Sequence, residues 1–183
     1  LNIVQGLGNE AGQALVEHPG VKAISLTGST KVGQSIATHC AQTLKKASLE
    51  LGGKNPTLLF SDAPRLGLMD LVARSAFQNS GQICLCGSRI LVERRIYAEF
   101  RDALVERAMA LRVGDPIDAD NDLGPLVSQA HFDKVMGAIE RARAEGGRVW
   151  CGGQALQRPG WFVTPTVIDG LGPECASNRE EIF

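Results

Sequence analysis

The chain has 183 residues, of which 44% are hydrophobic and 21% charged, and its 19 basic and 20 acidic side chains leave a net charge of −1. This composition is typical of a globular protein, and the near-neutral charge gives no electrostatic reason to expect nucleic acid or a membrane surface as a partner. No apolar run approaches the roughly 18 residues of a membrane span, and no export signal is evident, so we expect a cytoplasmic protein.

The five cysteines are odd in number and scattered along the chain, which favours free thiols in a reducing compartment over a disulfide framework. They occupy positions 40, 84, 86, 151 and 175. No second cluster with histidine completes a set of four zinc ligands, so we expect no metal.

The first third of the chain alternates predicted strands and helices. An apolar strand end at 1–4 and a glycine-rich turn precede a short helix, and a strand at 21–26 leads through cap-type residues into a helix at 31–40. A further strand at 47–51 is broken by Gly52-Gly53. The glycine-spaced run at 6–12 is one residue longer than the Rossmann fingerprint, so we expect it to serve only as a turn.

The remaining two thirds continue the alternation. Strands are predicted at 57–60, 88–93, 149–151 and 166–168, and helices at 65–79, 96–111 and 128–145. Such alternation predicts an α/β fold with a mostly parallel sheet. The glycine break divides the chain into segments 1–52 and 53–183.

Two motifs carry the chemistry, Leu49–Pro56 around Glu50 and Gly81–Arg89 around Cys84. An unpaired carboxylate in an apolar strand is costly, so Glu50 is a candidate general base, the alternative being a structural ion pair with Lys54. A thiolate is a strong carbon nucleophile, and the glycines around Cys84 allow the backbone to expose it. The alternative is an inert buried thiol. Cys86 points the other way in extended backbone and is expected to serve in packing.

These motifs, with 34 positions from Glu50 to Cys84, closely resemble those of the aldehyde dehydrogenase superfamily. The resemblance implies that Cys84 is the nucleophile and Glu50 the general base in the oxidation of an aldehyde to a carboxylate, through a thiohemiacetal and a thioester. It also implies that segment 1–52 ends a Rossmann-type cofactor domain and that 53–183 begins the catalytic domain. Lys54 and Asn55 are interpreted as hinge residues that support Glu50.

The same resemblance implies a nicotinamide cofactor, NAD with NADP not excluded, near the Thr27–Thr30 turn and the closing Glu-Glu-Ile-Phe motif. Free N–H groups at a helix start favour a phosphate, which agrees with the first of these places. The residues implied are Gly28, Ser29, Val32, Gly33, Leu51, Glu181 and Phe183.

In the resembled family further residues precede Leu1 and follow Phe183, including an asparagine that binds the oxyanion. We therefore expect a fragment that has negligible activity alone, from a parent that is a homodimer or homotetramer acting on a small aldehyde. Three segments, at 81–86, 124–128 and 131–135, are similar to those of the branch that acts on 2-hydroxymuconic and 2-aminomuconic semialdehydes. Two alternatives remain, a CoA-acylating semialdehyde dehydrogenase, which typically lacks the base at Glu50, and a non-catalytic fragment or pseudo-enzyme with a binding role.

Overall fold

The computed structural model describes residues 1–183, which form two compact units, Leu1–Gly52 and Gly53–Phe183. The boundary lies between the two adjacent glycines of the Glu50 motif. That the first unit ends a cofactor domain and the second begins a catalytic domain stays a prediction.

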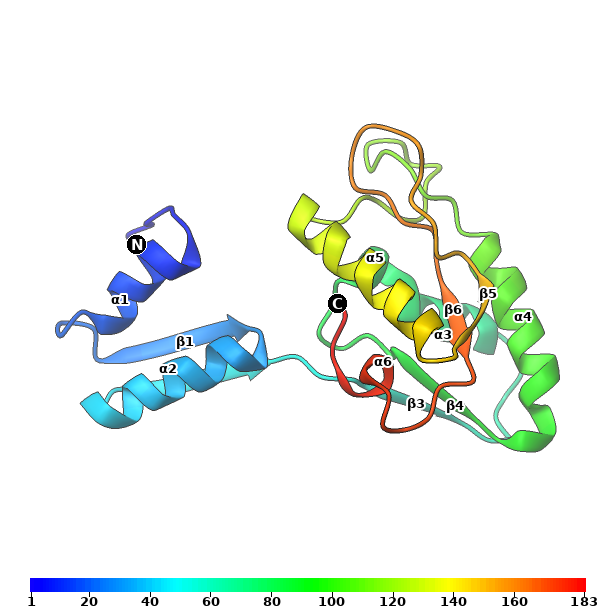
Figure 1. Ribbon diagram of the computed structural model, residues 1–183, viewed down its shortest axis with the longest axis horizontal. Helices are drawn as coiled ribbons and strands as arrows, with labels where there is room; N and C mark the ends of the chain where they lie inside the picture. Colours follow the sequence, from blue (N-terminus) through cyan, green and yellow to red (C-terminus); the bar gives the residue numbers. More distant parts are fainter. The chain divides into compact units, whose positions relative to one another are not determined.

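The first unit is a strand-helix-strand unit preceded by a short helical segment (Figure 1). The strands pair in parallel from Ala23↔Lys46 to Gly28↔Leu51, which requires the crossover that the helix between them supplies. The elements are η1 (Gly8–Gly12), α1 (Gln13–Glu17), β1 (Ala23–Gly28), α2 (Thr30–Thr43) and β2 (Lys46–Leu51). The strand end predicted at 1–4 is wrong, because no strand of the chain pairs with this segment and its apolar side chains are exposed.

The second unit has its apolar core between a parallel strand pair and two helices. Strand β3 (Pro56–Leu59) pairs with β4 (Arg89–Val92), while α3 (Leu68–Phe77) and α4 (Tyr97–Met109) contact each other. Four buried side chains form the centre of this core, namely Leu59, Val72, Phe100 and Leu104. The Gly81–Arg89 motif around Cys84 runs directly into β4, so the packing of β4 against the core fixes the C-terminal end of this motif.

The rest of the second unit comprises α5 (Gln129–Ala144), β5 (Arg148–Cys151), β6 (Val167–Asp169) and α6 (Ala176–Arg179), with short helices η2 (Gln78–Gly81) and η3 (Arg94–Ile96) earlier in the chain. Strands β5 and β6 pair in antiparallel fashion with an irregularity between Val149 and Cys151, so parallel pairing is not universal. The short helix α6 was not predicted.

Local signals explain where the helices begin and end. Ser29 and Ser128 accept a hydrogen bond from the third backbone N–H of α2 and α5, at 3.4 and 3.2 Å, as N-cap residues do. The helix predicted at 65–79 is shorter at both ends, because Gly67 before it and Asn79 after it have positive φ. A left-handed residue cannot continue a right-handed helix.

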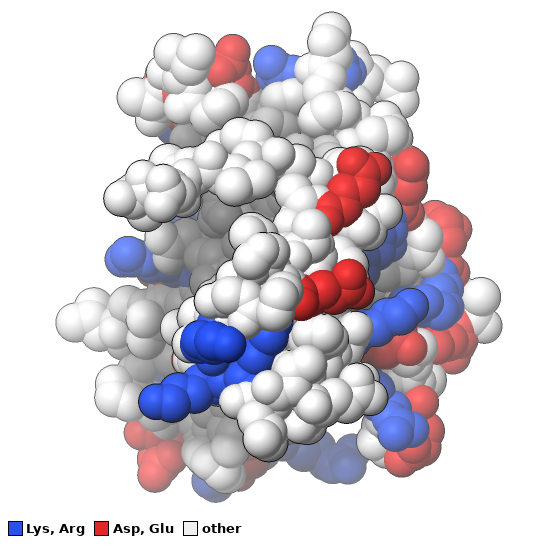
Figure 2. Space-filling model, turned by 90° about the vertical axis from the view of Figure 1, so that its left-hand side faces the viewer, with Lys and Arg blue, Asp and Glu red and all other residues white.

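Charge is mixed on the surface. On the face shown in Figure 2, basic and acidic side chains both lie among a majority of uncharged ones. None of the helices combines the length and apolar character that crossing a membrane requires.

Candidate functional site

Cys84 lies on an exposed turn between η2 and β4. The backbone N–H of Cys86 donates to the carbonyl of Ile83 at 3.0 Å and closes this turn, which we call the thiol turn (Ile83–Cys86). Cys84 is exposed, whereas Cys86 is only 7% exposed. The two thiols therefore lie in different surroundings, and the role of Cys84 as the reactive thiol stays a prediction.

The Cys86 thiol is held in its neutral form. Burial raises its pKa above the ordinary value, and the nearby Cys84 and Glu181 act in the same direction, against a hydrogen bond to the backbone of Ile83. A thiol with a raised pKa is a poor nucleophile near neutral pH. The role of Cys86 in packing follows from this environment.

Side chains before the thiol turn fasten it to the loop that precedes α5. The Gln82 side chain accepts from the N–H of Val127 at 2.9 Å and donates to the carbonyl of Pro125 at 3.4 Å. The Ser80 hydroxyl donates to the carbonyl of Gly124 at 2.8 Å. These contacts cross more than forty residues of sequence, and the motif alone gave no sign of them.

The backbone immediately before the turn is left-handed at three consecutive residues, with φ values of +54° at Asn79, +57° at Ser80 and +81° at Gly81. Only glycine adopts this conformation without cost. The Asn79 amide donates to the carbonyl of Gln82 at 3.1 Å, so the strained segment is held by its own side chain.

On the other side of the turn, Gly87 is buried where the chain passes between β3 and α3. A Cβ placed on it would lie 2.3 Å from Thr57 Oγ1 and 2.7 Å from Ser75 Oγ. Its N–H donates to the carbonyl of Ser75 at 3.1 Å. Gly87 therefore permits a close approach that any larger residue would prevent.

Asn55 reaches the thiol turn from the start of β3. Its side-chain amide donates to the carbonyls of Cys84 at 2.6 Å and Cys86 at 3.3 Å. The sequence analysis assigned Asn55 to the support of Glu50 and missed this contact, although its place in the motif marked it as a residue of interest.

Glu50 lies on β2 and is exposed, so the expectation that it is buried among apolar side chains is wrong. The reason is that β1 and β2 form a sheet of only two strands, in which a strand position does not guarantee burial. Glu50 belongs to the first unit and Cys84 to the second. Its pairing with the thiol stays a prediction.

Five of the seven predicted cofactor residues come together in the first unit. Gly28 ends β1 opposite Leu51 on β2, Ser29 caps α2, and Val32 and Gly33 lie in its first turn. The Val32 side chain is 47% exposed, whereas Gly33 is buried against Leu51. No acidic residue occurs in this first turn. The arrangement suits an anion at the start of α2.

The other two residues, Glu181 and Phe183, lie in the second unit. Burial lowers the pKa of Lys54 and the nearby Arg89 adds to this, while the charge of Glu181 acts in the opposite direction. Glu181 therefore lies close to Lys54. The ring of Phe183 meets that of His131 edge to face, with centroids 5.8 Å apart.

Glu145 anchors the segment that carries these two residues. Its carboxylate accepts from the N–H of Ala176 at 3.0 Å and from the hydroxyl of Ser177 at 3.0 Å. Glu145, which is distant in sequence, thus acts as a cap for the first turn of α6. Burial opposes the shift, but these donors hold the pKa of Glu145 below its ordinary value. Arg141, one turn earlier on α5, pairs with Glu180 at 3.3 Å.

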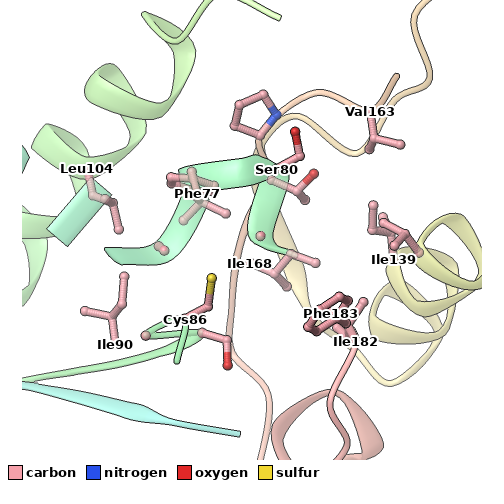
Figure 3. Close-up of a pocket in the computed structure, with 18 of the residues that line it drawn as sticks. Phe77, Ser80, Cys86, Ile90, Leu104, Ile139, Val163, Ile168, Ile182 and Phe183 are labelled. Carbon is pink, nitrogen blue, oxygen red and sulfur yellow. The ribbon is translucent and has the colours of Figure 1, made fainter. Parts of the chain in front are cut away.

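A pocket of about 320 Å³ lies inside the second unit, between α3, α4, α5, β6 and the closing segment. Its lining is mostly apolar, and Figure 3 shows the sulfur of Cys86 directed into it. Cys84 does not line this pocket. The pocket therefore belongs to the interior behind the thiol turn and not to the side from which Cys84 can be reached. No group of three or more metal-ligating side chains is arranged to hold an ion.

The chain is similar over its whole length to known proteins. The model of the aldehyde dehydrogenase family matches residues 1–183. The chain is 46% identical over 190 residues to the 2-aminomuconic semialdehyde dehydrogenase of Danio rerio, with all of this chain and 39% of that protein covered. It is 43% identical over 182 residues to a betaine aldehyde dehydrogenase of Cereibacter sphaeroides, with all of this chain and 38% of that protein covered.

Solved structures are similar over nearly the whole chain. The betaine aldehyde dehydrogenase of Staphylococcus aureus in complex with NAD+ has a TM-score of 0.94 at 34% identity, covering 98% of this chain and 36% of that one. An aldehyde dehydrogenase from Burkholderia cenocepacia, described as putative, has a TM-score of 0.93 at 40% identity, covering 97% and 37%. The chain thus spans less than two fifths of the length of the curated relatives named above.

Proposed function

Because this chain belongs to the aldehyde dehydrogenase family and has its α/β fold, we propose that the protein oxidises an aldehyde to a carboxylate through a covalent intermediate on Cys84. The observation that carries the proposal is the exposed thiol of Cys84 on a turn that motif residues hold on both sides. The activity is proposed for a protein of the length of the relatives. We propose that the 183 residues alone have negligible turnover.

The first step is addition of the Cys84 thiolate to the carbonyl carbon of the aldehyde. The new C–S bond moves the carbonyl electron pair to oxygen, and this oxyanion needs N–H donors. The backbone N–H of Cys84 has no acceptor within the chain, so it is free to donate to the oxyanion. The product of this step is a thiohemiacetal on Cys84.

The second part of the reaction is hydrolysis. When bound, the nicotinamide cofactor accepts the hydride that the thiohemiacetal loses on becoming a thioester. Glu50 then takes a proton from water, the water oxygen attacks the thioester carbon, and the C–S bond breaks to release the carboxylic acid and return Cys84 to its thiolate. The acid then loses its proton to solvent. Glu50 is exposed on β2 and is therefore accessible to water.

The residues present fit a dinucleotide. The cap residue Ser29 and the start of α2, without an acidic side chain in its first turn, would hold the phosphates, and Gly33 keeps the helix close to Leu51. Val32 would contact the adenosine, while Glu181 and Phe183 would contact the nicotinamide ribose and ring. The NAD+ complex of the Staphylococcus aureus protein supports NAD as the cofactor.

For the substrate, we propose a muconic semialdehyde. The identity with 2-aminomuconic semialdehyde dehydrogenases supports this choice, and the betaine aldehyde dehydrogenases at slightly lower identity make betaine aldehyde the natural comparison substrate. A higher kcat/KM for betaine aldehyde than for 2-aminomuconic semialdehyde would refute the choice.

The test of the mechanism measures NADH formation by the whole protein with NAD and an aldehyde. Cys84→Ala is expected to lower the rate of NADH formation at least about 1,000-fold, because the variant lacks the nucleophile. Cys175→Ala, which removes another thiol, is the matched control. Glu50→Gln is expected to keep the initial burst of NADH and lose steady-state turnover, with Glu17→Gln as its control. Undiminished turnover in Cys84→Ala would sink the covalent mechanism.

A further inference from the structure

We propose that Asn55 is a positioning residue for Cys84, an inference that rests on the proposed role of Cys84 as nucleophile. Its side-chain amide is the only side-chain group of the chain that donates to the carbonyls of Cys84 and Cys86. The two hydrogen bonds reach across the thiol turn from Asn55, the residue directly before β3, and β3 contributes Leu59 to the apolar core.

Apart from the hydrogen bond between the N–H of Cys86 and the carbonyl of Ile83 that closes it, the turn is held only through the residues that flank it. Before Cys84, Gln82 is fastened to the loop at 125–127, and after it Gly87 is fastened to Ser75. Between these anchors Cys84 and Leu85 are exposed. Without Asn55 the peptide group that follows Cys84 would have no partner inside the chain.

That peptide group determines how Cys84 is presented. A peptide unit is planar and rigid, so holding the Cys84 carbonyl at 2.6 Å fixes the rotation of the Cys84–Leu85 plane and with it ψ of Cys84. The backbone nitrogen and the Cβ that carries the thiol are both bonded to the Cα of Cys84. By fixing ψ, Asn55 therefore fixes how the bonds to this nitrogen and to this Cβ are oriented relative to the anchored carbonyl.

The chemistry of the contact requires an amide. Both partners are carbonyl acceptors, and the NH₂ of asparagine supplies two donors from one nitrogen. Aspartate has the same size but only acceptors, so it would face both carbonyls with negative charge. Asn55 is itself held firmly, because its own carbonyl accepts from the N–H of Arg89 at 3.1 Å where β4 begins.

The test compares two Asn→Asp substitutions in the whole protein. Asn55→Asp is expected to slow the pre-steady-state NADH burst about 10- to 100-fold, the effect of a small misplacement of a reacting group, with KM for the aldehyde changed less than about threefold. Asn178 is the matched control, because its amide also donates to two carbonyls, those of Leu171 at 3.1 Å and Gly172 at 2.9 Å. Both variants are measured at saturating NAD, and under this condition Asn178→Asp is expected to keep the burst rate.

A burst at the wild-type rate in Asn55→Asp, or an equal loss in Asn178→Asp, would overturn the inference. If Asn55→Asp does not fold, Asn55→Ser, which keeps one donor on a shorter arm, is expected to give a slower burst than wild type, and an undiminished burst would count against the proposal. Cys84→Ala in the same series separates the two questions. If it retains hydride transfer, the proposed function fails, whereas a normal burst in Asn55→Asp beside an inactive Cys84→Ala refutes the positioning role alone.

Discussion

Gly33 of α2 lies directly against Leu51 of β2. A Cβ built on Gly33 would come within 2.6 Å of Leu51 Cδ2 and 2.9 Å of Leu51 Cδ1. Because Leu51 is also paired in register with Gly28, this contact fixes the distance between the helix and the two strands where the predicted cofactor residues gather.

Gly33→Ala is therefore expected to destabilise the protein by up to about 2 kcal/mol, since the cost of displacing Leu51 or α2, about 1–3 kcal/mol, exceeds the gain in helix propensity of about 1 kcal/mol. Chemical unfolding measures the change. Gly12→Ala is the matched control, because nothing lies within 4 Å of a Cβ at Gly12 and its φ is −62°. Adding Leu51→Ala is expected to remove part of the cost of Gly33→Ala, and strict additivity of the two changes would contradict the proposed contact.

Gly87→Ala is expected to displace the thiol turn. The added methyl would overlap the hydroxyls of Thr57 and Ser75, so we expect a loss of about 1–3 kcal/mol in the free energy of unfolding and a slower NADH burst. Gly137→Ala, at an exposed position of α5 with no atom near the new Cβ, is expected to leave both unchanged or to raise stability slightly. Equal effects of the two substitutions would argue against close packing at Gly87.

Glu93 makes the stability of the second unit depend on pH in the acidic range. The N–H of Ser61 donates to its carboxylate at 2.7 Å and is the main reason that its pKa lies below the ordinary value of 4.5, with a further contribution from Arg95. Because the pKa of Glu93 is lower in the folded than in the unfolded protein, Glu93 contributes its full stabilisation at pH values above its pKa in the unfolded protein. This contribution is lost as the pH falls through its pKa in the folded protein. Glu93→Gln is expected to lower the unfolding midpoint at pH 7 and to match wild type at the acid end of a series from pH 7 to 3. A difference that does not change with pH would be inconsistent with this role.

Glu145→Gln is expected to loosen the segment that carries Glu181 and Phe183, because a neutral amide accepts more weakly from the donors of Ala176 and Ser177. Faster hydrogen exchange at 176–179 is the direct measurement. If Glu181 and Phe183 contact the cofactor, KM for NAD also rises, whereas KM for the aldehyde changes less. Glu140→Gln on the same helix, which removes an exposed pair with Arg143, serves as the control.

Sequence alone predicted those features that depend on neighbours along the chain. The cap residues before α2, the β1–α2–β2 order and the opposite exposure of Cys84 and Cys86 follow from local signals. Contacts between distant segments carry no such signal. Asn55 meets Cys84 across 29 positions, and Glu145 caps α6 across 31. The exposure of Glu50 was missed for a related reason, because burial depends on what covers a strand and not on its own residues.

The three left-handed residues before the thiol turn restrict what evolution or a mutant library can place there. At Asn79, Ser80 and Gly81 the backbone conformation admits glycine freely, tolerates asparagine and aspartate, and penalises β-branched side chains. A saturation mutagenesis screen for activity at positions 79–81 should thus recover only a few amino-acid types, with valine and isoleucine absent. Leu85 is exposed and has a negative φ, so position 85 should accept many amino-acid types.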